Sequence, residues 1–158
     1  MKNKELRIFA IFLIALFFPC LIFIHGCNDI NEMSHTPELA DLTIAGIDVV
    51  PLIELHPIFV AEDFGLDIAV RNIGPLSSGG YIMSIEIEEI ATGLVSPIGT
   101  FNRDPVPAGE ILTIYSTREL VIDKPGSYRI NVELIPNGWE DANLGNNTTY
   151  HDFNAVLY

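Results

Sequence analysis

From Leu39 onward, apolar and polar residues alternate along the chain with a period of two, and clusters of Gly, Pro or Asn interrupt the alternation. In one segment, for example, Leu66, Ile68 and Val70 alternate with other, mostly charged residues. This pattern is typical of short antiparallel strands that bury one face and expose the other to solvent. No long window after the N-terminal segment has helical spacing. We therefore predict strands over residues 40–50, 63–72, 80–90, 94–101, 110–118, 126–135 and 147–157.

Seven short strands in about 120 residues fit two packed antiparallel sheets. The connecting segments 105–109 and 124–126 agree with this, because Pro sets φ and Gly permits positive φ in the turns that lead into strands. We expect an all-β fold, an immunoglobulin-like antiparallel β-sandwich of about seven strands, over residues 39–158. Residues 28–38 are polar and without periodicity, and we interpret them as a tether.

The N-terminal segment has the layout of a secretory signal. Residues 1–7 are basic, residues 8–24 contain no charged side chain, and a polar stretch follows. Gly26 before Cys27 resembles a lipobox, the site at which bacterial lipoproteins are cut before a lipidated cysteine. We therefore expect residues 1–27 to be a signal peptide or membrane anchor, with lipidation at Cys27.

Two alternatives to a lipoprotein remain open for this segment. An uncleaved helix over residues 8–24 would be about 25 Å long, short of the ~30 Å hydrocarbon core but within the range of known spans. Simple secretion after cleavage is the other, less favoured alternative. In all three cases the basic residues stay on the cytoplasmic side, so the domain after Cys27 is expected to be extracytoplasmic.

The excess of acidic residues narrows the range of possible partners. The chain has 8 Lys and Arg against 21 Asp and Glu, and Lys2, Lys4 and Arg7 precede the apolar segment. The remaining chain cannot assemble the basic face that nucleic acid binding requires.

Cys20 and Cys27 are the only cysteines, and both precede the sandwich. A hydrophobic core, without disulfides, must therefore hold the exported domain together.

The sequence does not favour an enzyme, and we predict no catalytic residues. It contains no H-E-x-x-H, G-x-S-x-G or Gly-rich phosphate-binding motif. Only two of the four histidines, His56 and His151, fall in the expected domain, and a surface or structural role is the simpler interpretation for each.

Oxygen-bearing side chains are concentrated in residues 137–152. Carboxylate and amide oxygens crowded together are the ligands that Ca²⁺ prefers, although this spacing is not that of an EF-hand. Asp141, Asn143, Asn146 and Asp152 are therefore candidate Ca²⁺ ligands, and no other cofactor is expected. The alternative is an ordinary turn in which Asn and Gly adopt left-handed conformations and Asn side chains cap the backbone.

The same loop contains Trp139, the only tryptophan of the chain. Exposed aromatic residues frequently anchor partners, so Trp139 with Asn137 and Glu140 forms a candidate binding loop. The alternative is that the indole ring folds back and caps one end of the sandwich.

Five motifs of the domain follow one another in order: ADLTI (40–44), VRNIG (70–74), PAGE (107–110), PGSY (125–128) and NN (146–147). In these motifs the domain resembles the CARDB module, the cell-adhesion-related domain of bacterial and archaeal surface proteins. Residues 136–142 depart from the family pattern, in which an Asp follows the sixth strand and a Glu precedes a pair of asparagines. The resemblance implies an extracellular binding or spacer module of immunoglobulin-like fold without catalysis.

Together these features predict a non-enzymatic binding or adhesion module at the cell surface, attached through a lipid or an N-terminal helix. The expected partner is a protein or polysaccharide of the envelope, and the membrane is contacted through the N-terminus. Two alternatives remain: a structural subunit of an envelope complex, and a Ca²⁺-dependent adhesin that uses residues 137–152.

Overall fold

The computed structural model describes residues 38–51 and 57–158. The chain divides into two units, Met1–Thr36 and Pro37–Tyr158, and every described residue lies in the second. The expected signal or anchor segment and the candidate lipidation site Cys27 lie outside the described residues. Among the residues that are described, no helix has the length and apolar character needed to span a membrane.

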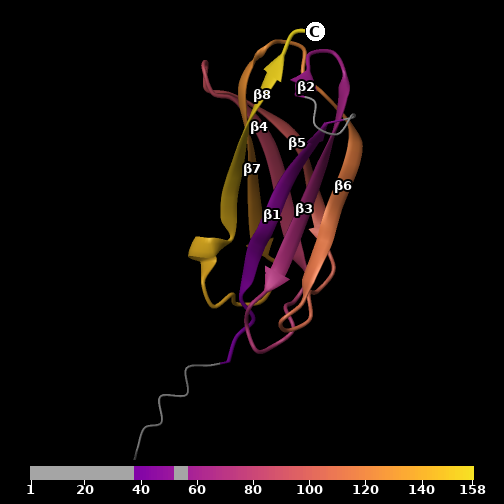
Figure 1. Ribbon diagram of the computed structural model, residues 1–158. Helices are drawn as coiled ribbons and strands as arrows, with labels where there is room; N and C mark the ends of the chain where they lie inside the picture. Colours follow the sequence, from indigo (N-terminus) through magenta and orange to yellow (C-terminus); the bar gives the residue numbers. More distant parts are fainter. Residues whose placement is uncertain (1–37, 52–56) are drawn as a thin grey trace, which may run out of the picture. The chain divides into compact units, whose positions relative to one another are not determined.

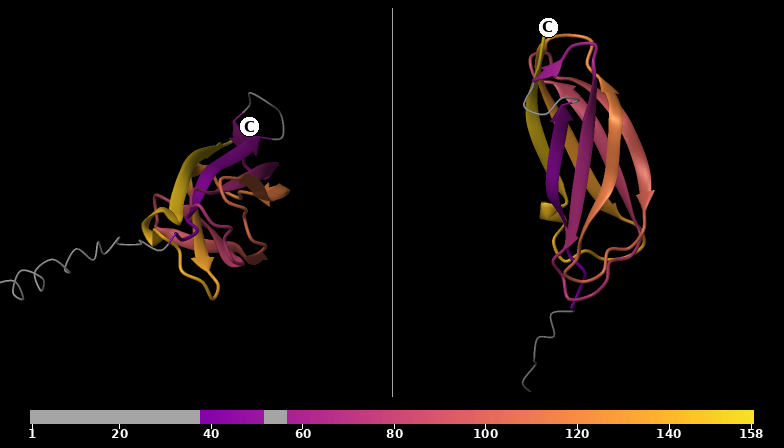
Figure 2. Two further views of the ribbon diagram at one scale, coloured as in Figure 1. Left: turned by 90° about the horizontal axis from the view of Figure 1, so that it is seen from below. Right: turned by 45° about the vertical axis from the view of Figure 1, so that its right-hand side comes forward.

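The described residues fold into two sheets packed face to face (Figures 1 and 2). One sheet has three strands in the order β1-β3-β6, and the other has five in the order β2-β8-β7-β4-β5. Neighbouring strands are antiparallel except β2, which pairs parallel with β8. The elements are β1 (Leu42–Pro51), β2 (Ile58–Phe59), β3 (Asp63–Asn72), β4 (Tyr81–Glu89), β5 (Leu94–Arg103), β6 (Ile111–Val121), β7 (Gly126–Pro136), η1 (Leu144–Asn146) and β8 (Thr148–Val156).

This architecture confirms the predicted all-β sandwich. Each of the seven predicted strands is present, with ends that differ by no more than about three residues, within the usual uncertainty of such boundaries. The prediction missed β2 and the short 3₁₀ helix η1, because two or three residues are too few to show a period.

The core lies between the sheets. It consists of the inward-pointing side chains of strands in which buried and more exposed residues alternate. Leu66, Ile68 and Val70 on β3 are completely buried, as the alternation predicted. Ile130 and Val132 on β7 face them from the other sheet and belong to the same cluster. By contrast, β5 and β6, one edge strand of each sheet, contain no buried residue.

A tyrosine corner marks the start of β7. The hydroxyl of Tyr128 donates a hydrogen bond of 2.9 Å to the carbonyl oxygen of Lys124, four residues upstream. This contact is a hallmark of immunoglobulin-like sandwiches, in which it fixes the turn between the sheets. The PGSY motif (125–128) therefore has a structural explanation.

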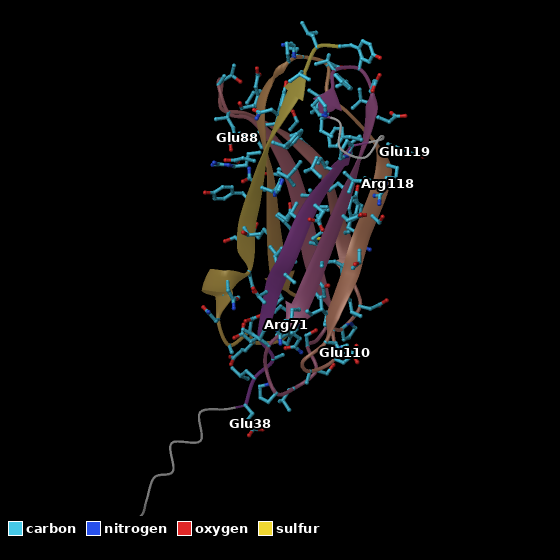
Figure 3. All side chains as sticks on the ribbon, in the orientation of Figure 1. Glu38, Arg71, Glu88, Glu110, Arg118 and Glu119 are labelled. Atoms are coloured by element: carbon cyan, nitrogen blue, oxygen red, sulfur yellow. The ribbon has the colours of Figure 1, made fainter. Side chains whose placement is uncertain are left out.

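The candidate residues of loop 137–147 lie at one end of the sandwich. Residue 38 lies at one end, which we call the basal end, together with the connections 73–80, 104–110 and 137–147 (Figure 1). Glu38, Arg71 and Glu110 mark this end in Figure 3. The candidate binding and metal residues of loop 137–147 are therefore at the end where the chain comes from the predicted tether.

Candidate functional site

A buried asparagine organises the basal end. Asn72 is completely buried, and its amide nitrogen donates to the carbonyl oxygens of Leu76 at 2.7 Å and Val106 at 2.9 Å. Its amide oxygen accepts from the backbone nitrogens of Asp41 at 3.1 Å and Gly74 at 3.0 Å. Both donors and both acceptor positions of the side chain are therefore used. One side chain thus fixes the start of β1 and two of the basal connections.

Gly74, two residues after Asn72, allows the N-terminal segment to pass close by. A Cβ atom at this position would lie 2.4 Å from the carbonyl oxygen of Leu39 and 2.6 Å from the backbone nitrogen of Asp41. Only glycine leaves room for this approach. The VRNIG motif that supported the family resemblance is therefore a structural motif of the basal end.

Asp141 joins loop 137–147 to the start of β1. Its Oδ2 accepts from the backbone nitrogen of Leu42 at 3.0 Å, and its Oδ1 accepts from the backbone nitrogen of Asn143 at 2.9 Å. The backbone nitrogen of Ala142 adds a bond of 2.9 Å to the carbonyl oxygen of Ala40. The carboxylate is thereby held in one orientation between two segments that are far apart in the sequence.

Two adjacent asparagines donate hydrogen bonds to two different carboxylates. Asn146 Nδ2 donates to Asp41 Oδ1 at 2.8 Å, and Asn147 Nδ2 donates to Asp141 Oδ2 at 3.3 Å. Asn147 is only 2% exposed, and the Oδ1 atoms of both asparagines are buried without a hydrogen-bond partner. We call Asp41, Asp141, Asn146 and Asn147 the Asp–Asn cluster.

The structure therefore brings together some of the predicted Ca²⁺ ligands and separates others. Asp141 and Asn146 belong to the cluster, whereas Asn143 Oδ1 accepts from Gly145 nitrogen at 3.2 Å and caps η1. Asp152 lies five residues beyond Asn147 on β8, roughly 16 Å along an extended strand. It is ion-paired instead with Arg129, whose Nε is 2.7 Å from its Oδ1.

Sequence reasoning missed Asp41 as a member of this cluster, and it placed Asn147 in the oxygen-rich segment 137–152 without naming it as a ligand. Asp41 precedes β1, a hundred positions before Asp141, and only its place in the ADLTI motif drew attention to it. Within the described residues, no group of three or more His, Cys, Asp or Glu could hold a metal ion. Any cation site among these residues must therefore add other oxygen ligands to the carboxylates, such as amide or backbone carbonyl oxygens.

Trp139 covers the basal end of the core. Its Nε1 donates to the carbonyl oxygen of Gly80 at 2.8 Å, and its half-buried ring packs against the main core cluster. A Cβ atom on Gly79 would lie 2.3 Å from the ring, so the indole presses against this backbone. Asn137 and Glu140, the other two residues of the candidate binding loop, are exposed.

The outer side of the β4-β7-β8 part of the larger sheet is polar, and we call it the outer face. Arg129 Nη2 is 3.0 Å from Asp152 Oδ2, and the guanidinium carbon lies 3.9 Å from the ring centre of Tyr150. Tyr150 is 59% exposed. Hydrogen bonding to Arg129 lowers the pKa of Asp152 and raises that of Arg129.

Two adjoining hollows run from this face to the basal loop. The first, of about 520 Å³, is lined by residues of β4, β7 and β8 that include Ser84, Glu86 and Tyr150. The second, of about 540 Å³, is bordered by Trp139 and Glu140. Both hollows are lined by Glu133 and Thr148, so together they form one groove with an aromatic ring near each end.

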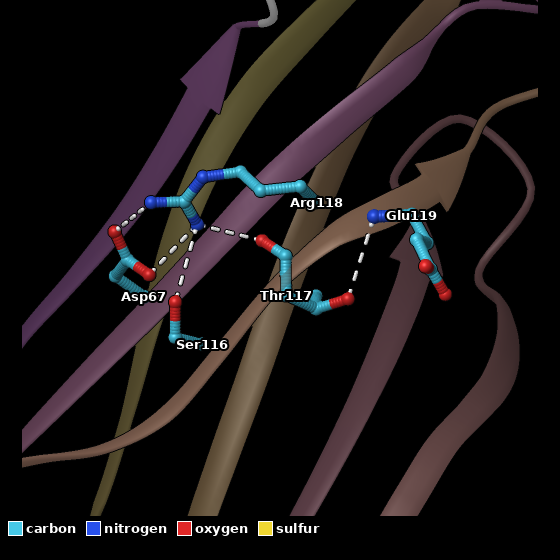
Figure 4. A network of polar contacts seen from close by, with 5 residues as sticks. All are labelled: Asp67, Ser116, Thr117, Arg118 and Glu119. Carbon is cyan, nitrogen blue, oxygen red and sulfur yellow. Dashed lines mark hydrogen bonds and ion pairs between the residues drawn. The ribbon is translucent and has the colours of Figure 1, made fainter.

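A second ion-paired network lies on the three-stranded sheet. Arg118 donates to Asp67 through its two terminal nitrogens, Nη1 and Nη2, each at 2.8 Å, and also donates to the carbonyl oxygen of Thr117 (Figure 4). The hydrogen bonds from Arg118 and Ser116 lower the pKa of Asp67. These contacts tie β3 to the edge strand β6, and we assign them a structural role.

Of the two histidines considered above, His151 lies in β8 opposite Ile130, and His56 lies outside the described residues. His151 is half-buried.

No family model and no curated protein matches the chain. Solved structures do match it. A CARDB domain from Pyrococcus furiosus, crystallised in complex with di-metal ions, is 20% identical with a TM-score of 0.60, over 77% of this chain and 97% of that domain. The solution structure of the same domain gives 21% identity and a TM-score of 0.54, over 77% and 99%.

Part of a β-glucosidase from Erythrobacter marinus is also similar, with 14% identity and a TM-score of 0.50. That likeness covers 74% of this chain but 16% of the enzyme, so it concerns one portion of a much longer chain. The CARDB domains, in contrast, are matched over nearly their whole length. The chain therefore folds as a CARDB-like, immunoglobulin-like β-sandwich.

Proposed function

We propose that the protein is a non-enzymatic extracytoplasmic module that binds an envelope polymer, with a polysaccharide as the favoured ligand. The groove between Tyr150 and Trp139 is the observation that carries this proposal. It is open and long, which suits an extended chain, and it combines aromatic rings with hydroxyl, amide and carboxylate groups. Because the groups from β4, β7 and β8 stand on paired strands, they are held rigidly in place before a ligand binds.

The chemistry of the groove favours a neutral or cationic ligand over an anionic one. Glu86, Glu133 and Glu140 border it, and the one nearby guanidinium, Arg129, is paired with Asp152. Repulsion between like charges disfavours an anionic polymer. A sugar chain can instead stack on the exposed ring of Tyr150 and hydrogen-bond to the carboxylates.

Co-sedimentation of the purified domain with insoluble peptidoglycan and with neutral polysaccharides tests this assignment. Tyr150→Ala is expected to weaken binding at least tenfold, since it removes the exposed ring at one end of the groove. Tyr158→Ala is the matched control, because Tyr158 is 99% exposed and lies outside the groove. Equal binding by both variants, or no retention by any of the polymers, would contradict the proposed ligand class.

We further propose that the module is attached to the membrane through a lipid on Cys27, or otherwise through the apolar helix of residues 8–24. The order of basic segment, apolar segment and Gly26-Cys27 supports this attachment. Intact mass of the membrane-fraction protein, expressed in a lipoprotein-processing bacterium, provides the test. A mature chain that starts at Cys27 with added acyl mass, absent from Cys27→Ser, is the expected result. An unprocessed mass would favour the helix, and a processed but unacylated chain in the soluble fraction would exclude both anchors.

The Asp–Asn cluster favours a second candidate function, adhesion that depends on Ca²⁺. Its two carboxylates and two amides supply the oxygen ligands that Ca²⁺ prefers. This candidate differs from the first in requiring a bound cation at the basal end, and it predicts that chelation of divalent ions abolishes adhesion.

A further inference from the structure

Most of the side chains that line the first hollow stand on two neighbouring rungs of the larger sheet. Each rung consists of residues that pair across β4, β7 and β8: Glu86, Asn131 and Tyr150 in one, and Ser84, Glu133 and Thr148 in the other. Glu133 is therefore the diagonal neighbour of both Glu86 and Tyr150 on one face of the sheet, at roughly 7–8 Å. One extended ligand can contact the ring and both carboxylates.

Arg129 orients the ring of Tyr150. Its guanidinium carbon lies over the ring, 3.9 Å from the ring centre, and two hydrogen bonds tie the guanidinium to Asp152. Arg129 and Asp152 pair with each other on the side of Tyr150 that is away from Glu133. Arg129 therefore covers one face of the ring, and a ligand can use the opposite face, toward Glu133 and Thr148. The ring is 59% exposed, so this face is accessible.

The carboxylates of Glu86 and Glu133 have no partner of opposite charge. Both side chains are exposed, and neither takes part in an ion pair or hydrogen bond within the described part of the chain. The described residues that line the two hollows include Glu140 and Asp141 but no Lys, Arg or His. A neutral ligand that covers these carboxylates removes water from charges that nothing else compensates, which is costly.

We propose that the groove selects a polysaccharide with protonated amino groups, which stacks a sugar ring on the free face of Tyr150 and directs ammonium groups to Glu133 and Glu86. Each ammonium group supplies the missing positive charge and hydrogen-bond donors that carboxylates accept strongly. The aromatic ring also attracts a cation near its face. This inference rests on the proposed function, because it takes the groove to bind a sugar chain, and it names the class of sugar.

The ring of Tyr150 favours an amino sugar over a basic peptide as the source of these ammonium groups. The amino group of a sugar is fixed relative to its ring, so stacking the ring on Tyr150 also places the charge. A lysine side chain has to be ordered over several rotatable bonds to reach the same carboxylates, and this ordering costs conformational entropy.

Two hexasaccharides, one of glucosamine and one of N-acetylglucosamine, test the proposal, because the acetyl group removes the charge and leaves the sugar chain otherwise the same. Isothermal titration calorimetry of the full chain in a neutral detergent measures both affinities. At about 20 mM salt the glucosamine hexamer is expected to bind at least tenfold more tightly, and this preference should shrink in about 0.5 M salt, which screens exposed charges. Tyr150→Ala should weaken the binding of both hexamers.

Glu133→Gln identifies the carboxylate that selects the charge. It keeps the size and hydrogen-bonding capacity of the side chain but removes its charge, and it should reduce the preference for the glucosamine hexamer at least fivefold. Glu119→Gln is the matched control, because Glu119 is exposed on β6 of the other sheet and lies outside both hollows (Figure 3). It makes the same change in net charge and should leave the preference unchanged.

Three results would overturn the inference. They are equal affinity for the two hexamers, no binding of either, and a preference that Glu119→Gln lowers as much as Glu133→Gln does. Hexalysine provides a further check, since binding as tight as that of the glucosamine hexamer, with no dependence on Tyr150, would mean that the groove recognises charge alone. Equal affinity for both hexamers that Tyr150→Ala weakens would leave the proposed polysaccharide function intact. That function fails separately, in co-sedimentation with the insoluble polymers.

Discussion

The basal end and the outer face contain the same kinds of polar residue but use them differently. At the basal end, Asn72 and Asp141 bond mainly to backbone atoms, and several of these belong to segments that lie far away in the sequence. On the outer face, Arg129 bonds to Asp152, and Asn131 lies 3.5 Å from Glu88, in each case between the side chains of strands that are already paired. The polar residues of the basal end therefore determine how the connections fold. Those of the outer face lie on a sheet that the hydrophobic core already stabilises.

This difference separates structural from functional candidates. A polar side chain that satisfies buried backbone groups cannot be removed without exposing them to an apolar environment, which is costly. An exposed pair between side chains contributes little to stability, because water competes for both partners. Residues of the outer face can consequently be replaced during evolution of a binding surface without a large loss of stability, whereas those of the basal end cannot.

Asn72→Ala should have the largest effect on stability. It would leave two carbonyl oxygens and two backbone nitrogens unpaired in a buried position, and we expect a loss of about 3–5 kcal/mol. Asn131→Ala on the outer face should cost less than about 1 kcal/mol. Urea denaturation of both variants measures the difference. Similar losses would mean that the outer face is also part of the structural framework.

Gly74→Ala should have the second-largest effect on stability, because its new Cβ atom would meet backbone atoms at 2.4–2.8 Å. Backbone cannot yield as a flexible side chain does, so we expect a loss of about 2–3 kcal/mol. Gly46→Ala in β1 is the matched control, since no atom lies within 4 Å of its Cβ position, and it should be neutral or stabilising by about 0.5–1 kcal/mol. A tolerated Gly74→Ala, as judged by thermal unfolding, would show that the basal connections can shift.

The sheets could be predicted because their signal is local. Leu66, Ile68 and Val70 alternate within a single strand, and this alternation alone decides which face is buried. The basal connections have no such period. The VRNIG and PGSY motifs drew attention through family resemblance, and only the structure shows why Gly74 and Tyr128 occupy those positions.

The candidate site was only partly predictable for the same reason. The residues of loop 137–147 are close in sequence, so their crowding could be recognised, but Asp41 reaches them only through the pairing of β1 with the rest of the fold. The prediction of Asp152 as a ligand failed for the opposite reason. It is near the loop in sequence, but an extended strand carries it away from Asn147, and a cross-strand arginine binds it.

Tyr81 provides a third, pH-dependent test at the start of β4. Its hydroxyl is buried without a partner, and burial raises its pKa from 10.0 to about 12. The folded state disfavours the ionised form, so this contribution to stability is complete below pH 10 and is lost as the pH rises to about 12. At pH 11 the wild type should lose about 1.4 kcal/mol that Tyr81→Phe retains.

The urea midpoints of both proteins at pH 7 and pH 11 measure this loss. At pH 7 Tyr81→Phe should be neutral or slightly stabilising, because it removes an unpaired polar atom. Tyr150→Phe on the outer face is the control for replacing an exposed hydroxyl, and it should not protect against alkaline pH. If Tyr81→Phe loses as much stability at pH 11 as the wild type, another group governs the alkaline transition.

Asp152→Asn should have the smallest effect of the four. The hydrogen bonds from Arg129 lower the pKa of Asp152 below its ordinary 3.8, so the pair contributes above that pH and its contribution is lost as the pH falls through the lowered value. Because both groups are exposed, the variant should be only slightly less stable at pH 7, and the difference from the wild type should shrink as the pH falls below 3.8 or in about 1 M salt. Thermal unfolding across pH and salt checks this. A large loss that persists in salt would place Arg129 and Asp152 in the framework of the fold, and the outer face would then not be free to evolve as a binding surface.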